Sequence, residues 1–197
     1  MKEAYLKELE KVVHDYRKHV LSVLILLEAG EYDRGYSYLM SLLADWDRAI
    51  VTAKEETGHI LFDGLISQFR AEAKSKQIEF KTDLSIDGSF PLEDQHLTAL
   101  LMNLWANAVK ATTQLAQNRC IELKVQANSS QFQLIMLNSY QSDQDIDNQS
   151  VKRQADRRWI RPGRGLAIVQ DIVKRYHGHY QVQWNSQYFI FQIVINQ

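Results

Sequence analysis

A histidine followed directly by an acid stands on the first predicted helix of this sequence. His14 and Asp15 open the run HDYRKH, which ends at His19. An imidazole with one unprotonated nitrogen is a nucleophile towards a phosphoryl group, and an adjacent carboxylate can orient the ring and accept a proton. The pair therefore predicts phosphoryl transfer to His14. The alternative is an ordinary surface histidine, which is what most exposed helical histidines are.

A second polar set lies on a helix predicted from about residue 93 to 115. Asn103, Asn107 and Lys110 follow one another at spacings of four and three, so they share one helical face. Amide oxygens are hard ligands of the kind that Mg²⁺ prefers, and an ammonium group suits the phosphates that the ion bridges. This face predicts a magnesium-phosphate site, with a solvated polar face as the alternative. The opposite, core-facing stripe comprises Leu97, Leu101, Leu104, Ala108 and Leu115.

A glycine-rich segment forms the third set. Gly163 and Gly165 open a predicted helix that ends at Gly178. Glycine lets a backbone approach a phosphate closely, and a helix N-terminus offers free N–H groups and a favourable dipole. The segment does not follow a strand, so it is not the dinucleotide-binding fingerprint. It predicts a phosphate contact at the start of this helix.

Two long helices with heptad seams are predicted for residues 1–57. Gly30 suits the end of the first helix. A lone antiparallel helical hairpin buries too little surface to be stable, so we expect two copies to pair as a four-helix bundle. From the seams alone, a purely structural coiled-coil hairpin stays equally open. The seams are Leu6, Leu9, Val13, Tyr16, Val20, Val23 and Leu27, then Tyr36, Leu39, Leu43, Trp46 and Ile50.

Residues 58–197 carry helix and strand patterns that predict a second domain, an α/β sandwich, and place the chain in the α+β class. The strands should form a mostly antiparallel sheet, with the helices separated from it. The polar stretch 141–158 is predicted to be a mobile loop. Helices are expected at about 60–76, 93–115 and 163–178, and strands at about 78–84, 121–127, 132–138, 180–184 and 188–195.

Composition excludes several classes of protein. The 197 residues are 45% hydrophobic and 24% charged, with a net charge of −1, so no global field attracts nucleic acid. One cysteine, Cys120, excludes an internal disulfide framework and fits a reducing compartment; it leads into an apolar strand and should fill the core. The apolar stretch 20–27 is far shorter than the roughly 20 residues of a membrane span. We therefore expect a cytoplasmic piece of protein.

Together the three sets resemble the sensor histidine kinases, in particular the peptide-pheromone (quorum-sensing) receptor group. Members of that group carry a histidine box like HDYxNH, an asparagine box like NLLDNAIEA and a glycine box like GxGLxxVxxIVxxYxG. The corresponding stretches here are HDYRKH at 14–19, NLWANAVKA at 103–111 and GRGLAIVQDIVKRYHG at 163–178. They occur in the same order, so the resemblance covers essentially the whole chain.

The resemblance implies a dimerisation and histidine-phosphotransfer hairpin over residues 1–57. It implies a catalytic ATP-binding domain of the histidine-kinase and Hsp90-like type over residues 58–197. His14 would be the phosphoacceptor and Asp15 its neighbouring acid. The implied reaction is autophosphorylation from Mg-ATP, followed by transfer to an aspartate of a response-regulator receiver domain. A homodimer is implied, and a membrane sensor domain N-terminal to this chain would fit such a receptor.

The resemblance also implies ATP and Mg²⁺ as ligands, with Asn107 as the metal ligand. Most histidine kinases read adenine with an aspartate in a DxGxG motif, which this sequence lacks. The pheromone-receptor group has an Asn-Ser or Asn-Thr pair instead, and Asn138-Ser139 matches it. An asparagine offers the adenine amino group an acceptor, as an aspartate would. The other nucleotide-binding residues implied are Asn103, Lys110, Gly163 and Gly165.

Three positions depart from the pattern of this group. Ala106 stands where an acid is usual, Trp105 is bulkier than the usual leucine, and Lys18 stands where many members have asparagine. In related kinases a polar residue at the last position helps to place water for dephosphorylation, so Lys18 leaves phosphatase activity open. None of the three removes an implied ligand, which favours an active kinase.

Two other functions fit part of the sequence. A phosphorelay histidine phosphotransferase would need His14 but not Asn103, Asn107 and the glycines, whose joint presence argues against it. A nucleotide-binding dimer scaffold without kinase activity would bind ATP and leave His14 unphosphorylated. A chaperone-type or topoisomerase-type ATPase would not explain the hairpin.

The heptad seams predict a homodimer at tens of micromolar protein, measured by light scattering. Trp46→Ala should weaken both dimerisation and folding, because the loss of a buried tryptophan costs about 3–5 kcal/mol. A monomer at that concentration would contradict the prediction.

Overall fold

The computed structural model describes residues 2–42, 57–87, 89–140 and 164–196. The chain divides into two compact units, Met1–Arg48 and Ala49–Gln197, which are treated separately below. The domain boundary predicted after residue 57 stays a prediction. Within the described ranges, no helix combines the length and apolar character that a membrane span requires.

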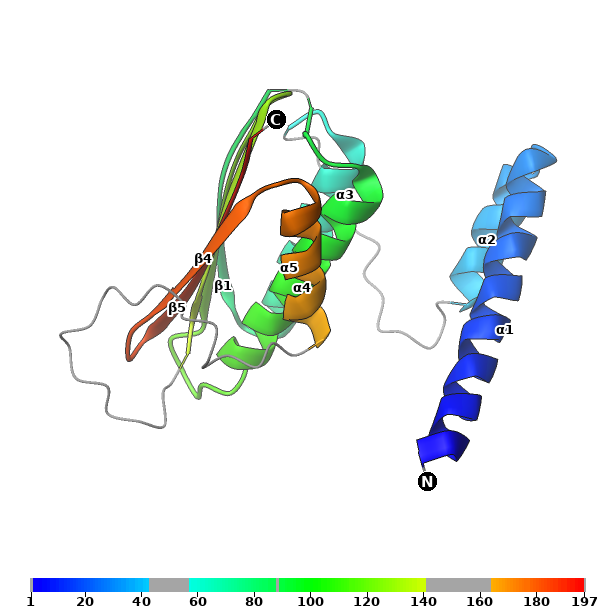
Figure 1. Ribbon diagram of the computed structural model, residues 1–197, viewed down its shortest axis with the longest axis horizontal. Helices are drawn as coiled ribbons and strands as arrows, with labels where there is room; N and C mark the ends of the chain where they lie inside the picture. Colours follow the sequence, from blue (N-terminus) through cyan, green and yellow to red (C-terminus); the bar gives the residue numbers. More distant parts are fainter. Residues whose placement is uncertain (1, 43–56, 88, 141–163, 197) are drawn as a thin grey trace. The chain divides into compact units, whose positions relative to one another are not determined.

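The described part of the first unit consists of two helices, α1 (Lys2–Glu28) and α2 (Tyr32–Leu42) (Figure 1). α1 ends where Gly30 takes a left-handed backbone, with φ of 74°. The Gly30 N–H donates to the Leu27 carbonyl at 3.0 Å, and the Glu31 N–H donates to the Leu26 carbonyl at 2.9 Å. This is a Schellman arrangement, which satisfies carbonyls that a helix end leaves open. Glycine tolerates the left-handed turn because it has no Cβ.

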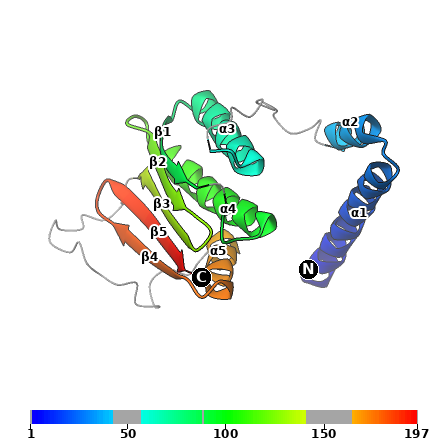
Figure 2. The same ribbon diagram turned by 90° about the horizontal axis from the view of Figure 1, so that it is seen from above.

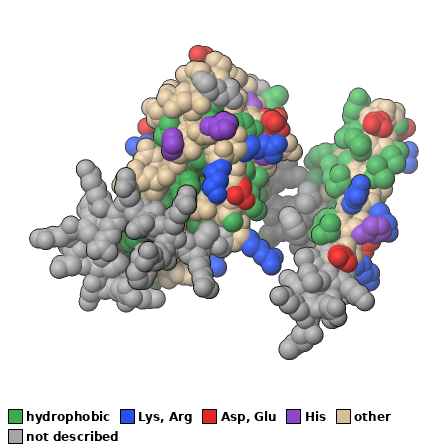
Figure 3. Space-filling view, in the orientation of Figure 1, with side chains coloured by type: hydrophobic (Ala, Val, Ile, Leu, Met, Phe, Trp, Pro, Cys, Tyr) green, Lys and Arg blue, Asp and Glu red, His purple; other side chains and the backbone are tan. Residues whose placement is uncertain are grey.

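Much of the first predicted seam is open to solvent in the single chain. Val23 is buried, but Val13, Tyr16 and Val20 are 61%, 58% and 65% exposed. Apolar side chains gather visibly on this unit (Figure 3). The later part of the second seam, residues 43–50, lies outside the described residues. The described part therefore presents an apolar surface that α1 and α2 do not cover between them.

In the second unit, three helices of the described chain lie on one face of a five-stranded sheet (Figure 2). The strand order is β1-β2-β3-β5-β4; β1 and β2 run parallel, and the other neighbours are antiparallel. The predicted mostly antiparallel sheet with separate helices is confirmed. The elements are α3 (Ile60–Ser75), β1 (Glu79–Ile86), α4 (Asp94–Thr112), β2 (Cys120–Ala127), β3 (Gln131–Ser139), α5 (Arg164–Arg175), β4 (His179–Trp184) and β5 (Tyr188–Asn196).

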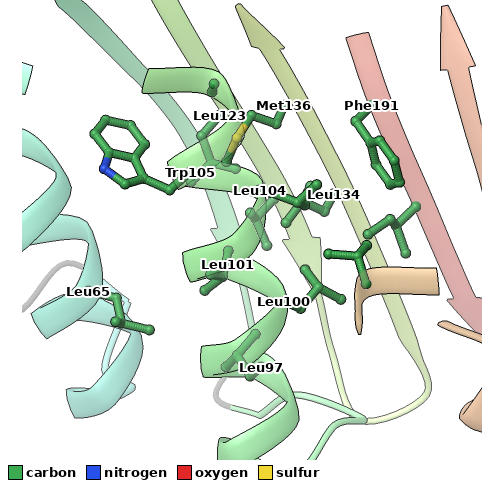
Figure 4. Close-up of a cluster of buried hydrophobic side chains, with 14 of the residues drawn as sticks. Leu65, Leu97, Leu100, Leu101, Leu104, Trp105, Leu123, Leu134, Met136 and Phe191 are labelled. Atoms are coloured by element: carbon green, nitrogen blue, oxygen red, sulfur yellow. The ribbon is translucent and has the colours of Figure 1, made fainter. Parts of the chain in front are cut away.

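The core of this unit fills the space between α4 and the sheet (Figure 4). Helical periodicity turns one side of α4 inward, and alternation turns every second residue of each strand towards it. Burial of this apolar surface is the main force holding helix and sheet together. The innermost residues include Leu97, Leu100, Leu101 and Leu104 of α4, Leu123 of β2, Leu134 and Met136 of β3, and Phe191 of β5.

The bulky Trp105 is accommodated between α4 and α3. Its ring stacks on Phe69, with centroids 4.4 Å apart and planes 9° apart. Its Nε1–H donates to Glu72 Oε2 at 2.6 Å, so the buried indole has a hydrogen-bond partner. The departure from leucine at this position therefore serves the contact between two helices.

Leu115, predicted as part of the core stripe of α4, lies beyond the helix and is only partly buried. α4 ends at Thr112, where the main chain tightens: the Gln114 N–H donates to the Ala111 carbonyl at 3.3 Å and the Leu115 N–H donates to the Thr112 carbonyl at 3.1 Å. The Thr113 hydroxyl donates to the Val109 carbonyl at 2.8 Å. The Arg119 guanidinium donates to the Leu115 carbonyl at 2.8 Å and to the Lys76 carbonyl at 3.0 Å. The helical period predicted for Leu115 does not extend into this capped turn.

α5 ends in the same kind of turn as α1, but with a non-glycine residue in the left-handed position. His177 has φ of 52°, and the Gly178 N–H donates to the Val173 carbonyl at 2.8 Å. Gly178 itself is required for space, since a Cβ there would lie 2.6 Å from Ile195 Cγ1 and 2.8 Å from the Val194 carbonyl oxygen. Glycine at this position thus allows α5 to turn closely against β5.

Substitution of the two residues of this turn should change stability differently. Gly178→Ala should lower the free energy of unfolding by about 1–3 kcal/mol, since the added methyl overpacks against β5. His177→Gly should be neutral or stabilising. It relieves left-handed strain of about 1–2 kcal/mol, offset by the chain entropy of glycine, about 0.5–1 kcal/mol. Urea unfolding of both variants checks the ranking, and equal losses would contradict it.

Candidate functional site

A cavity of about 170 Å³ opens between α4, α5 and the neighbouring strands β3 and β5. Its walls are mostly apolar, with asparagine amides as the main polar groups. A concave apolar site with a few placed polar groups is what a small ligand requires. The lining residues are Leu104, Asn107, Ala108, Ala111, Met136, Asn138, Tyr140, Leu166, Phe189 and Phe191.

α4 contributes one wall through residues three and four apart, which share a face of the helix. Asn107 is exposed within this wall, and its side chain has no hydrogen bond or ion pair with any described residue. Its amide is therefore available to a ligand. Lys110, one turn further along, is also exposed but does not line the cavity. The structure thus brings Asn107 to the cavity and leaves Lys110 outside its walls.

β3 contributes Asn138, which is 3% exposed. Alternation along the strand places it on the same face as Phe132, Leu134 and Met136, towards the helices. It is one of few buried polar residues in the described chain, at the end of an otherwise apolar row. A buried amide at that position costs free energy unless it is hydrogen-bonded, and its Nδ2 donates to the Ser139 carbonyl at 3.0 Å.

Asn103 and Gly165 meet where the first turn of α5 rests on α4. The Asn103 Nδ2 donates to the Ala99 carbonyl at 2.7 Å, which holds the side chain back along its own helix. A Cβ on Gly165 would lie 2.7 Å from Asn103 Oδ1. Glycine is therefore needed for this close approach. Gly163, the other predicted phosphate-binding glycine, lies outside the described residues.

His14 and Asp15 lie on α1, in the first unit. The His14 side chain is 65% exposed, and its Nδ1 is 3.7 Å from Asp15 Oδ1. Lys18 Nζ lies 3.5 Å from the same oxygen. His19 differs in being partly buried, with its Nδ1 2.9 Å from the Tyr38 hydroxyl of α2. Of the two histidines on this helix, His14 has the freer ring.

Cys120 was predicted to fill the core, and this is wrong. The residue is half-buried and pairs with Glu79 on the sheet face away from the helices. Burial raises the pKa of its thiol, and the negative charge of Glu79 raises it further. The protonated thiol is a poor nucleophile. Alternation along β2 explains the error, because the buried series begins one residue later, at Ile121.

The apolar lining of the cavity was not predicted from the sequence. Met136, Phe189 and Phe191 were assigned only to strands, although each shares a strand face with the buried series. Their position on the buried face of a strand could have predicted that they line the cavity. Tyr140 follows the end of β3, so no strand alternation predicted its position. Its place depends on the Tyr140 N–H, which donates to the Gln187 carbonyl at 2.9 Å.

Comparison with known families matches residues 92–196 to the GHKL domain. The chain belongs to the GHKL domain family. The match includes every described residue that lines the cavity. A comparison with curated proteins gave no match.

Solved structures show the same fold for the GHKL domain. Two nucleotide-free forms of the catalytic domain of histidine kinase ThkA are 17% identical, with TM-scores of 0.51 and 0.50. Each alignment includes 69% of this chain, and it includes 89% and 90% of the two ThkA chains. The histidine kinase AdeS of Acinetobacter baumannii is 14% identical, with a TM-score of 0.47, 93% of this chain and 97% of that chain being covered. The ThkA matches show that the second unit has the fold of a histidine-kinase catalytic domain.

The Asn103–Gly165 contact predicts an energetic coupling between α4 and α5. Gly165→Ala should cost about 1 kcal/mol of stability, because the Asn103 side chain must give up its place. In an Asn103→Ala background the same change should stabilise by about 0.5–1 kcal/mol, as alanine does at an unobstructed helix position. The double-mutant cycle, followed by urea unfolding, should therefore give a coupling energy of about 1.5–2 kcal/mol.

Gly64 of α3 provides the matched control for this cycle. A Cβ there would meet nothing within 4 Å, so Gly64→Ala should stabilise by about 0.5–1 kcal/mol in either background. If Gly165→Ala behaves like Gly64→Ala, the contact does not constrain the helices.

Proposed function

We propose that this chain is the core of a sensor histidine kinase of the peptide-pheromone receptor group. It would autophosphorylate His14 from Mg-ATP and pass the phosphoryl group to an aspartate of a response regulator. One observation carries the proposal: a single GHKL cavity has Asn107 in one wall and the buried Asn138 in another. The Asn103–Gly165 contact joins the two helices that contribute to that cavity.

ATP fits this site because GHKL domains bind ATP and because the cavity suits a flat, partly polar ring. Phe189, Phe191 and Met136 offer apolar contact, and Asn138 offers a hydrogen-bonding amide deep in the wall. Burial of such a ring against apolar side chains provides affinity, and one placed polar group provides orientation. We propose Asn138 as the residue that reads the base.

Mg²⁺ fits the available donors. It is commonly held by one or two protein oxygens, with water and substrate phosphates completing the shell. Asn107 supplies one amide oxygen, and the described residues contain no cluster of three His, Cys, Asp or Glu that would make a cage. When bound, the ion would neutralise charge on the transferring phosphoryl group. Phosphate contacts are proposed for Asn103, Lys110, Gly163 and Gly165.

The environment of His14 supports it as the phosphoacceptor. Asp15 lies beside Nδ1, so Nε2 is the nitrogen proposed to attack the γ-phosphorus. The N–P bond would form as the bond from phosphorus to the bridging oxygen breaks and ADP leaves. Asp15 would hold the ring and stabilise its positive charge. His19 is a poorer acceptor because its ring is engaged by Tyr38.

The open seam of α1 supports a homodimer. Val13, Tyr16 and Val20 expose more than half of their surface, and burial of such residues against a second copy would stabilise a four-helix bundle. We propose residues 1–57 as this dimerisation and phosphotransfer hairpin and residues 58–197 as the catalytic domain. A receiver domain would dock near His14, on the cytoplasmic side of any membrane sensor.

Phosphorylation with radiolabelled ATP tests the proposal. Label should appear on the wild-type chain, be acid-labile as a phosphoramidate is, and vanish in His14→Gln. It should persist in His19→Gln. Asn107→Ala should abolish both label and magnesium-dependent ATP binding while leaving the circular dichroism spectrum unchanged, because that side chain is not part of the core.

Two outcomes would overturn parts of this scheme. Label retained in His14→Gln and lost in His19→Gln would move the phosphorylation site. ATP binding without any label would identify a nucleotide-binding scaffold in place of a kinase.

A further inference from the structure

β3 leaves its ladder with β2 at Ser139, one residue after Asn138. Main-chain pairing of the two strands ends at Ile121 and Asn138. At the next position the Cys120 N–H donates to Ser139 Oγ at 2.9 Å, and that hydroxyl donates to the Cys120 carbonyl at 3.3 Å. The serine hydroxyl therefore bonds to both main-chain groups of Cys120, and it takes the Cys120 N–H that would otherwise pair with the Ser139 carbonyl. The Ser139 carbonyl is left free of the ladder.

Two side chains, in place of the main chain of β2, donate hydrogen bonds to the Ser139 carbonyl. The Thr112 hydroxyl donates to it at 3.1 Å and Asn138 Nδ2 donates at 3.0 Å. Thr112 is the last residue of α4 and is fully buried. A carbonyl oxygen has two lone pairs, and these two donors use both. The end of the asparagine helix is thereby tied to the strand that carries Asn138.

This carbonyl decides which end of the Asn138 amide faces the cavity. A carbonyl oxygen only accepts hydrogen bonds, so the amide nitrogen of Asn138 must lie against it. Rotation of the amide by 180° would instead bring Oδ1 of Asn138 against the Ser139 carbonyl oxygen. Within the described chain, Oδ1 of Asn138 has no hydrogen-bond partner. Every side-chain nitrogen or oxygen that is fully buried there does have one, so Oδ1 is not a buried atom. Oδ1 is therefore accessible, and the accessible space beside Asn138 is the cavity that it lines.

We infer that Thr112 and Ser139 are positioning residues that hold the Asn138 amide with its oxygen towards the cavity. The cavity then selects a ring that carries a hydrogen-bond donor opposite this oxygen and rejects a ring that carries an oxygen there. The inference rests on the proposed nucleotide binding. It adds that selectivity for the base depends on two residues that need not touch the ligand.

Calorimetry with ATP and inosine triphosphate, each with Mg²⁺, measures this selectivity on the full chain. Inosine triphosphate has an oxygen in place of the amino group of the adenine ring. Wild type should bind ATP more tightly by about tenfold or more, because the analogue sets an oxygen against Oδ1 of Asn138 and leaves that acceptor unpaired in the complex. In Ser139→Ala the main chain can rejoin β2, so the amide is freed to turn and the ratio of the two affinities should fall towards one.

Variants of Thr112 separate positioning from a merely structural role. Thr112→Val removes the hydroxyl and should lower the ratio, whereas Thr112→Ser keeps the hydroxyl and should keep the wild-type ratio. Lys110→Ala, at a proposed phosphate contact outside the cavity walls, should weaken both nucleotides equally and leave the ratio unchanged. If Ser139→Ala does not fold, the Val and Ser variants of Thr112 decide the question.

An unchanged ratio in the folded Ser139→Ala and Thr112→Val variants, with ATP still bound, would overturn the positioning role alone. A wild-type preference for inosine triphosphate would do the same. Failure of the wild-type chain to bind either nucleotide would overturn the proposed function and this inference with it.

Discussion

The packing of α4 against the sheet is the constraint on which the GHKL domain depends. This helix packs on β2 and β3, and residues of the same helix form a wall of the cavity. Leu104 and Ala108 belong to both surfaces, so the residues that hold the helix on the sheet also shape the site. The amides of Asn103 and Asn107 are consequently placed by hydrophobic burial, which is far stronger than any contact they make themselves.

Short polar connections then fix details that apolar packing leaves free. Apolar burial has no direction, whereas a hydrogen bond specifies which atom faces which. Thr112 and Ser139 set the orientation of one amide, the bond from Asn103 to Ala99 sets another, and Arg119 ties the turn after α4 to the end of α3. The cavity is thus a product of non-directional burial refined by a few directional bonds.

The two units differ in how completely they bury their own apolar surface. The second unit buries an extended core, while α1 leaves Val13, Tyr16 and Val20 open. Exposed apolar surface of this extent in a helix pair suits contact with another molecule. The proposed kinase needs such a division, because the histidine must be accessible to a nucleotide and later to a receiver domain, while the nucleotide site must be enclosed.

Periodicity determined most of the elements from the sequence alone. The helix predicted at 60–76 is α3 (Ile60–Ser75), and the strand predicted at 132–138 is β3 (Gln131–Ser139), because side-chain alternation is a local property. The same reasoning placed Asn103, Asn107 and Lys110 on one face of a helix. Their proposed roles in binding nucleotide stay predictions, as do those of His14 and Asp15.

Tertiary structure alone decided which of these residues meet. Lys110 shares the face of Asn107 but not the cavity, since the cavity walls depend on β3, β5 and α5 as well as on α4. Leu115 lies outside α4 because the chain after Thr112 closes in a tighter turn, in which the Leu115 N–H donates to the Thr112 carbonyl. The glycines at 165 and 178 are required by Asn103 and by β5, partners distant in sequence. Local pattern determines the face on which a side chain lies; what it contacts depends on long-range packing, which no local pattern contains.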